Sequence, residues 1–262
     1  MKRYIKVYLK LLSMSWSTNM VYRVNFFLWA FIHSFTAVIS IIFFKTVFGF
    51  ISDINGWSYY EILILVGTRK LFTGIGSLTV IPMIYGLTGY IKNGKLEGLL
   101  AKPIDTIFMA AFRWLDVEDV GNIFIGLGII IFSAREGGIY LGFGNIILFS
   151  ILLILGLIIL HSVIVIIFSF ALRLIFVESL NNLVWTFLNI SDRPVTIYKG
   201  GMYIFLVFIL PIAMMVFVPV QALINKVDWV LVGYSIVFTI ITFFSSRFLF
   251  YRSLRNFSGV SS

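Results

Sequence analysis

The run from Gly137 to Leu172 reads GGIYLGFGNIILFSILLILGLIILHSVIVIIFSFAL and contains no Asp, Glu, Lys or Arg. About 20 apolar residues let a helix cross the hydrocarbon core of a bilayer, where every backbone polar group must be paired within the protein. This run is long enough for one crossing helix together with a loop and an interfacial turn. It therefore indicates an integral membrane protein.

The rest of the chain has the same character. Of its 262 residues, 60% are hydrophobic, 18% are aromatic and 12% are charged, whereas soluble domains have about 25% charged residues. We predict an all-α fold, a single transmembrane domain over residues 1–262 with six transmembrane helices. One helix is assigned to each uncharged run: Val24–Phe44, Leu71–Ile91, Val120–Ala134, Gly137–Leu172, Gly200–Asn225 and Trp229–Ser246.

Basic residues are concentrated on alternate connections between these runs. One set holds 15 Lys and Arg residues and the other holds three, with Arg69 and Lys70 inside the second apolar region left uncounted. Positive residues favour the cytoplasmic side, so both termini are predicted to be cytoplasmic, with inner loops at 90–119 and 173–200. The net charge of +9 also attracts anionic lipid. Because the basic residues are scattered over four loops and are not gathered on one face, we do not expect nucleic-acid binding.

Residues 1–20 are predicted to form an interfacial helix on the inner leaflet. The segment has no small-residue cleavage site and precedes a full-length span, so it does not resemble a removable signal peptide. An apolar stripe faces a basic one, which is typical of a helix lying on a membrane. The residues are Tyr4, Ile5, Tyr8, Leu12 and Trp16 against Lys2, Lys6 and Lys10.

The first inner loop contains a short amphipathic segment that ends at Pro103, where a helix is interrupted. It has two interpretations: a docking helix for a partner, or a solvated loop whose lysines only set the topology. Its apolar side would be formed by Ile91, Leu96, Leu99 and Leu100. The candidate docking residues are Ile91, Lys92, Gly94, Lys95, Leu96, Glu97, Leu99, Leu100 and Pro103.

The same segment nearly spells a nucleotide-binding P-loop between Gly89 and Leu96. It ends on Leu96 instead of the Ser or Thr whose hydroxyl ligates magnesium, and it follows a membrane helix instead of a strand. We therefore expect no nucleotide or other cofactor in this chain. Any ATP-driven activity would come from a separate subunit.

Arg69 and Lys70 are unusual because a charge at mid-bilayer costs about 2.5–3.5 kcal/mol on insertion scales. One hypothesis is that Lys70 faces a subunit interface or an anionic part of a cargo, on a stripe of small residues that permits close helix packing. The other is that the span begins at Leu71 and both cations reach the outer interface. Arg69 and Lys70 are thus candidate pathway or interface residues.

Chemical motifs are few. The absence of Cys excludes disulfides and thiolate metal sites. Asp116, Glu118 and Asp119 could be a metal or acid–base cluster, but with no His nearby in the sequence they are interpreted as a charged helix start. His161 lies deep in the fourth run and is interpreted as a packed core residue. These patterns do not indicate an enzyme.

Several patches of the chain resemble the permease subunits of type-2 ATP-binding-cassette exporters, in particular a bacterial branch with six spans and short outer loops. The resemblance extends over most of the chain and depends on the order of the patches. They are Met20-x-Tyr22-Arg23-x-Asn25-Phe26, Gly56-Trp57-Ser58, Ile91-x-x-Gly94-x-Leu96-Glu97-x-x-Leu100-x-x-Pro103, Arg193-Pro194-x-x-Ile197-Tyr198, and Pro211 through Pro219-x-x-x-Leu223. Glu97, Lys102 and Arg193 depart from the usual pattern, as does the Arg69-Lys70 pair.

The resemblance implies a bacterial plasma-membrane permease whose partners are two ATPase subunits, a second permease subunit and membrane lipid. ATP and magnesium would bind to the ATPase partners. Residues 91–103 would act as the coupling helix, and residues 1–17 would match the family's connecting helix. The cargo would be an amphipathic compound, drug, lipid or peptide. The alternatives are an ion-coupled secondary transporter, which would need acidic or His residues at mid-membrane, and a non-transporting scaffold or immunity protein.

Overall fold

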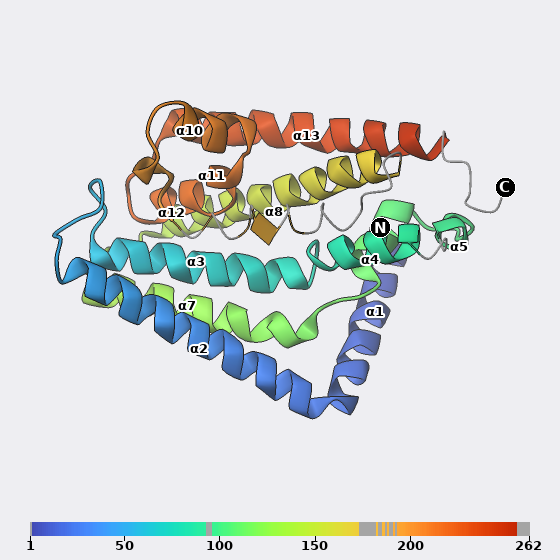
Figure 1. The fold of residues 1–262 in the computed structure, drawn as a ribbon, viewed down its shortest axis with the longest axis horizontal. Helices are drawn as coiled ribbons and strands as arrows, with labels where there is room; N and C mark the ends of the chain where they lie inside the picture. Colours follow the sequence, from blue (N-terminus) through green and yellow to red (C-terminus); the bar gives the residue numbers. More distant parts are fainter. Residues whose placement is uncertain are drawn as a thin grey trace.

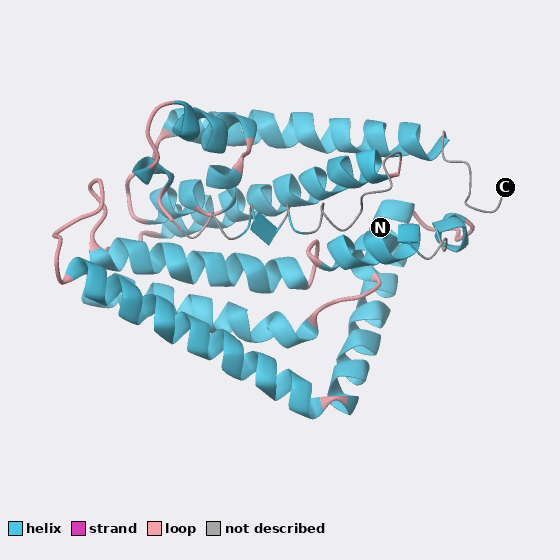
Figure 2. Ribbon diagram, in the orientation of Figure 1, coloured by secondary structure: helices cyan, strands magenta, loops and turns pink. Residues whose placement is uncertain are grey.

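The computed structural model describes residues 2–92, 96–172, 182, 185, 186, 188, 191 and 193–255. The regular elements in this part of the chain are all helical (Figure 2). Four helices are long and apolar enough to cross a membrane: α2 (Arg23–Phe48), the segment Val117–Glu136 that contains α7, α8 (Phe143–Ala171) and α13 (Trp229–Arg255). The structure therefore confirms the prediction of an all-α fold with helices that can cross a membrane.

The long helices form two packed pairs. Helix α3 (Tyr59–Ser77) packs along α7 (Gly121–Glu136), with α2 laid against both, and α8 packs along α13. Helix α1 (Lys2–Val21) runs across one end of the bundle instead of along it (Figure 1). None of its residues is fully buried, and its location on the membrane surface stays a prediction.

Glycine permits the close approach of α3 and α7. A methyl group added at Gly126 would lie 2.5 Å from the carbonyl oxygen of Gly67 and 2.6 Å from the backbone nitrogen of Leu71. A methyl group at Gly74 would lie 2.8 Å from the backbone nitrogen of Ile123. Small residues are the usual means of close helix packing in a membrane, where lipid supplies no hydrophobic drive for association.

The second predicted helix, Leu71–Ile91, is wrong as a single element. Helix α3 begins earlier, where the Ser58 hydroxyl accepts a hydrogen bond from the Glu61 backbone N–H and the Glu61 carboxylate accepts one from the Ser58 backbone N–H, which forms a capping box. The chain then turns at residues 78–81 before α4 (Pro82–Lys92). The cap starts the helix well before the uncharged run, so Arg69 and Lys70 lie inside α3 and not at its outer end.

The fifth predicted helix, Gly200–Asn225, is also wrong as a continuous span. It is divided into α10 (Gly201–Ile204), the π-helical turn η3 (Phe205–Ile209), α11 (Ile212–Met215) and α12 (Phe217–Leu223). The break falls at Pro211, which has no N–H to continue the helix. Met215 reaches α8, where a methyl group added at Gly156 would lie 2.9 Å from its Cα.

The C-terminal end of α8 and residue 195 lie at opposite ends of the bundle. Helix α8 ends near α4, at the end that carries α1. The Thr196 carbonyl, in the short helix η2 (Val195–Ile197), accepts a hydrogen bond of 2.9 Å from Asn55 in the loop between α2 and α3. That loop lies at the opposite end (Figure 1). Most of the second cytoplasmic loop predicted over 173–200 lies outside the described residues, and that loop stays a prediction.

The segment α10–α12 returns to that same opposite end. Trp57 packs on Phe217 with ring centroids 5.3 Å apart, and Lys226 Nζ donates to Glu61 and to the Gly56 carbonyl, both at 2.8 Å. The segment thus dips between α3, α8 and α13 and comes back, which is the shape of a re-entrant segment. Within its irregular part, Leu206 and Val207 are buried, whereas Ile204, Phe205 and Ile209 are exposed.

We expect Gly126→Ala to destabilise the protein, because the added methyl group meets backbone atoms of α3 that cannot rotate away. Overpacking of this kind costs about 1–3 kcal/mol. Gly128→Ala on the same helix is the matched control, since its methyl group meets nothing within 4 Å. Thermal unfolding of the detergent-purified variants measures the difference. Equal unfolding temperatures for the two variants would contradict the packing of α3 on α7.

Candidate functional site

The predicted coupling segment is built from the end of α4 and the short helix α5 (Leu96–Leu100). Leu96 and Leu99 are each 1% exposed and belong to the protein's own core, whereas Leu100 is 40% exposed. Glu97 and Gly98 are exposed as well. The predicted apolar docking side of Leu96, Leu99 and Leu100 is therefore wrong as a set, because two of its three leucines hold α5 onto the protein.

The remaining predicted docking residues flank α5. Lys92 is the last residue of α4, and Ile91 precedes it in that helix. Gly94 and Lys95 lie outside the described residues. Pro103 follows α5, and its carbonyl accepts a hydrogen bond of 3.0 Å from Arg3 of α1.

Helix α6 (Thr106–Phe112) connects α5 to the rest of this end of the bundle. Asp105 caps it by accepting from the Phe108 backbone at 2.9 Å. The same carboxylate accepts from Tyr251 of α13 and lies 3.7 Å from Arg247. Tyr4 of α1 packs edge-on against Phe108 with ring centroids 4.8 Å apart. Helix α6 therefore contacts α5, α1 and the residues of α13 that approach Asp105.

A second link joins α1 to the turn between α3 and α4. Tyr8 packs edge-on against Phe112 at 5.2 Å, and its hydroxyl donates to the Leu78 carbonyl at 3.3 Å. Farther along α1, the Ser15 hydroxyl accepts from the Leu115 backbone at 3.3 Å. Sequence reasoning missed these contacts, because nothing in the amphipathic pattern of α1 says which loops it covers.

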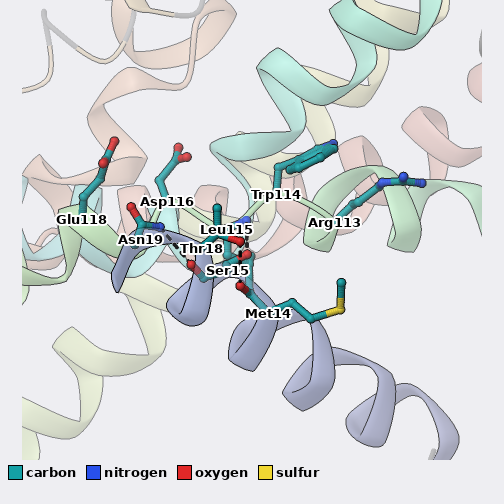
Figure 3. A pocket seen from close by; sticks show the side chains of 9 residues that line it. All are labelled: Met14, Ser15, Thr18, Asn19, Arg113, Trp114, Leu115, Asp116 and Glu118. Atoms are coloured by element: carbon teal, nitrogen blue, oxygen red, sulfur yellow. Dashed lines mark hydrogen bonds between the residues drawn. The ribbon is translucent and has the colours of Figure 1, made fainter. Parts of the chain in front are cut away.

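A cavity of about 240 Å³ lies between α1 and the segment that follows α6 (Figure 3). The Asp116 and Glu118 side chains extend at one end of it, near Asn19, while Met14 and Arg113 lie at the other end. Burial, with the charges of Asp119 and Glu118 close by, raises the pKa of the Asp116 carboxyl from 3.8 to about 7. Asp116 thus titrates near neutral pH.

Lys70 and Arg69 leave α3 in different directions. Lys70 Nζ donates to the Thr36 hydroxyl at 2.8 Å and to the His33 carbonyl at 3.2 Å, both on α2. Arg69 Nε donates to the Leu188 carbonyl at 2.7 Å, and another guanidinium nitrogen contacts Thr73. The two cations therefore line the interior of the bundle. The hypothesis that both extend to the outer interface does not fit these contacts.

The carboxylates at the start of α7 meet a histidine from another helix. His33 Nε2 lies 2.5 Å from Asp119 Oδ1, and the Ser77 hydroxyl donates to the other oxygen of Asp119 at 2.6 Å. Glu118 accepts from Asn25 of α2 at 3.0 Å. The interpretation of an acidic group with no His nearby is corrected, because 86 residues of sequence separate His33 from its partner.

Two further cavities adjoin at His33 and Thr73, which line both. The larger, about 460 Å³, is acidic and aromatic, and the smaller, about 280 Å³, is polar and basic. The larger is lined by Trp29, His33, Thr73, Tyr85, Asp116, Glu118, Asp119 and Trp185. The smaller is lined by His33, Thr36, Ser40, Arg69, Lys70, Thr73 and Asn122.

The described residues of these cavities include no group arranged to hold a metal ion. His161 is not part of this cluster and lines a separate, mostly apolar cavity with Arg247. What the arrangement offers is a binding region, with charges of both signs and aromatic rings around open space. Its residues are visible in the sequence as rare charges within apolar runs, but only the fold brings them together.

Comparison with known proteins gives one match. A family model described as ABC-2 family transporter protein matches residues 34–261. No curated protein and no solved structure matches the chain. The match covers most of the chain and agrees with the family resemblance of its sequence patches.

We expect Asp116→Asn to stabilise the protein, and more at pH 8 than at pH 5. Because the pKa of Asp116 is raised from 3.8 to about 7 in the folded state, the folded protein binds more protons than the unfolded chain between these two pH values. The free energy of unfolding therefore falls as the pH rises through this window, and it stays lower above it. The neutral amide removes this loss. Thermal unfolding at the two pH values measures it, with Glu136→Gln at the exposed end of α7 as the control. An equal shift at both pH values would contradict a buried Asp116.

Proposed function

Because this chain belongs to the ABC-2 transporter family, we propose that it is the membrane-spanning permease subunit of an ATP-driven exporter in a bacterial plasma membrane. Separate ATP-binding-cassette subunits would bind ATP and magnesium and supply the energy. This chain would supply the passage through the membrane and the surface on which the ATPases act. The observation that carries the proposal is the position of α5, which is anchored by one face and exposed on the other.

The proposed topology has six crossings with both termini in the cytoplasm. Five of the proposed crossings are α2, α3, α7, α8 and α13, and the sixth would come from the part of the chain between α8 and α13. The ends of α1 and α13 lie at the same end of the bundle (Figure 1), in support of an even number of crossings. If Arg193 and Lys199 are counted on the outer side, 13 Lys and Arg residues remain on the cytoplasmic side and five lie on the outer side. The positive-inside bias therefore remains.

The proposed coupling step begins at α5. An ATPase bound to Glu97, Gly98 and Leu100 would move α5 and α6 together, because Leu96 and Leu99 fix α5 to the core. The Asp105 contacts would pass this movement to α13, and the Tyr4 and Tyr8 contacts would pass it to α1. ATP would then shift the permease between two conformations through the different affinities of the ATPases for each.

We further propose that two permease subunits form the complete passage. Of the residues of α2, only Ala37 is buried, although the helix carries polar groups as well as large apolar side chains. An apolar helix surface this open faces lipid or another protein. A second permease subunit, identical or related, would cover part of it and enclose the cavities beside His33 and Lys70.

An ion-coupled secondary transporter is the second candidate. The His33–Asp119 contact near Lys70 favours it, because titratable groups inside a bundle are typical of proton-coupled carriers. Vesicles that contain this chain alone decide between the two functions. Uphill transport driven by a proton or sodium gradient would establish the secondary transporter, whereas transport that requires the ATPase and ATP would establish the exporter.

The docking surface is tested by the double variant Glu97→Lys and Leu100→Glu. Both side chains are exposed, so we expect membrane insertion and thermal stability to be retained while co-purification with the ATP-binding-cassette subunit falls at least tenfold. Reversing charge and removing an apolar contact at the centre of an interface costs about 2 kcal/mol or more. Arg255→Glu, exposed on α13, is the matched control. Undiminished co-purification of the double variant would place the docking surface elsewhere.

A further inference from the structure

A separate cavity of about 270 Å³ lies between α6, α8 and α13. Most of its lining is apolar and includes Ala111 of α6, Leu157 and Ile158 of α8, and Phe243 of α13. Ile154 also lines it and is 55% exposed, so the cavity opens on the outer surface of α8. In a membrane, that surface faces lipid chains.

Arg247 lines this cavity with donors that no described residue takes. Its Nε is buried without a hydrogen-bond partner, while the side chain as a whole is 42% exposed and can be reached by a ligand. The Asp105 carboxylate approaches one guanidinium nitrogen only to 3.7 Å, which is too long for a hydrogen bond. Asp105 instead accepts from Tyr251 and from the Phe108 backbone. Arg247 therefore keeps donors for an external acceptor.

The other polar lining residues are His161 and Thr79. Within the described residues the His161 side chain makes no hydrogen bond, so it can donate one ring N–H to a ligand. The Thr79 hydroxyl already donates to backbone carbonyls of α3 and is not counted as a donor. The guanidinium of Arg247 lies 5.3 Å from the centre of the Phe243 ring, which holds it beside the apolar wall.

Polar and apolar lining residues are separated along the bundle axis. Helices α8 and α13 both end at the end of the bundle that carries α1 (Figure 1). His161 follows Leu157 on α8, and Arg247 follows Phe243 on α13. The two polar side chains therefore lie at the α1 end of the cavity, and the apolar wall continues from them toward the middle of the bundle.

The position of Arg247 on α13 suits the boundary of a bilayer. The 27 residues of α13 make a helix about 40 Å long, which is longer than the hydrocarbon core of about 30 Å. Arg247 lies about 12 Å before the end of this helix, and a long Arg side chain extends toward the head groups. Lipid phosphates lie at that boundary, so the cation and the apolar wall stand in the order of a lipid head and its chain.

We propose that this cavity binds a phospholipid, with its phosphate on Arg247 and the upper part of one acyl chain along Leu157, Ile158 and Phe243. Guanidinium and phosphate form strong charge-assisted hydrogen bonds. The volume is slightly below that of drug-sized sites, which suits part of one chain. The lipid would be resident and not cargo, so the inference goes beyond the permease function. It would join α6 to α8 and α13.

The test measures the affinity of the first lipid bound to the delipidated full-length chain by native mass spectrometry in detergent. Dioleoylphosphatidylglycerol carries phosphate and tails, dioleoylglycerol only the tails, and glycerol 3-phosphate only the phosphate. We expect the phospholipid to bind at least tenfold more tightly than either other probe, since a charge-assisted contact contributes about a factor of ten. Glycerol 3-phosphate binding as tightly as the phospholipid would assign a soluble anion. Dioleoylglycerol binding as tightly would show that the phosphate is not recognised. Either result overturns the proposal.

A first pair of variants locates the phosphate. Arg247→Gln is expected to weaken phosphatidylglycerol about tenfold and to leave dioleoylglycerol unchanged. Arg252→Gln is the matched control, because Arg252 is exposed on the same helix and is not among the residues that line the cavity. Equal weakening by the two variants would indicate attraction to surface charge alone and would overturn the site.

A second pair locates the chain and does not depend on Arg247. Ile154→Trp is expected to fill the opening of the cavity and to weaken both tailed probes at least threefold, since its larger side chain would occupy the space of the acyl chain. Ile151→Trp is the matched control, one turn earlier on α8. Ile151 and Ile154 are 50% and 55% exposed, so both variants are expected to fold. Unchanged binding to Ile154→Trp would place the lipid elsewhere.

Discussion

Charged side chains within an apolar bundle must find polar partners, and in this protein that requirement holds α2, α3 and α7 together. Lys70 in the middle of α3 is satisfied by Thr36 and the His33 carbonyl of α2. His33 in turn contacts Asp119 at the start of α7, which also accepts from Ser77 of α3. Leaving any one of these groups unpaired would cost several kcal/mol. The three helices are thus joined by polar contacts on the side where α2 has almost no buried apolar surface.

Close packing on the other side of α3 complements these contacts. Gly67 and Gly126 bring the backbones of α3 and α7 within contact of each other, so the polar groups at their inner ends face a narrow and well-defined space. The cavities beside His33 thus lie next to a closely packed pair of helices.

The end of the bundle that carries α1 is organised differently. There the contacts converge on one short helix, α6, which joins α5, α1, α4 and α13. Asp105 alone caps α6, accepts from Tyr251 and approaches Arg247. The cavity between α1 and Asp116 connects this end to the interior, because Asp116 and Glu118 line both it and the larger cavity beyond. Shared lining residues thus link the contacts around α1 to the larger cavity beside His33.

The sequence by itself determined the membrane class, the helical fold and the family, because composition, uncharged runs and motif order can be read without the tertiary structure. It located the helices at Val24–Phe44 and Trp229–Ser246 well, but it misplaced those whose boundaries depend on other features. The Ser58–Glu61 cap moved the start of α3 toward the N-terminus, and the fifth run is divided at Pro211 into short helices. Only the tertiary structure decided that Leu96 and Leu99 face the core, and that His33, Lys70 and Asp119 share one site. Those facts depend on contacts between residues that are tens of positions apart, and a local sequence pattern does not reveal such contacts.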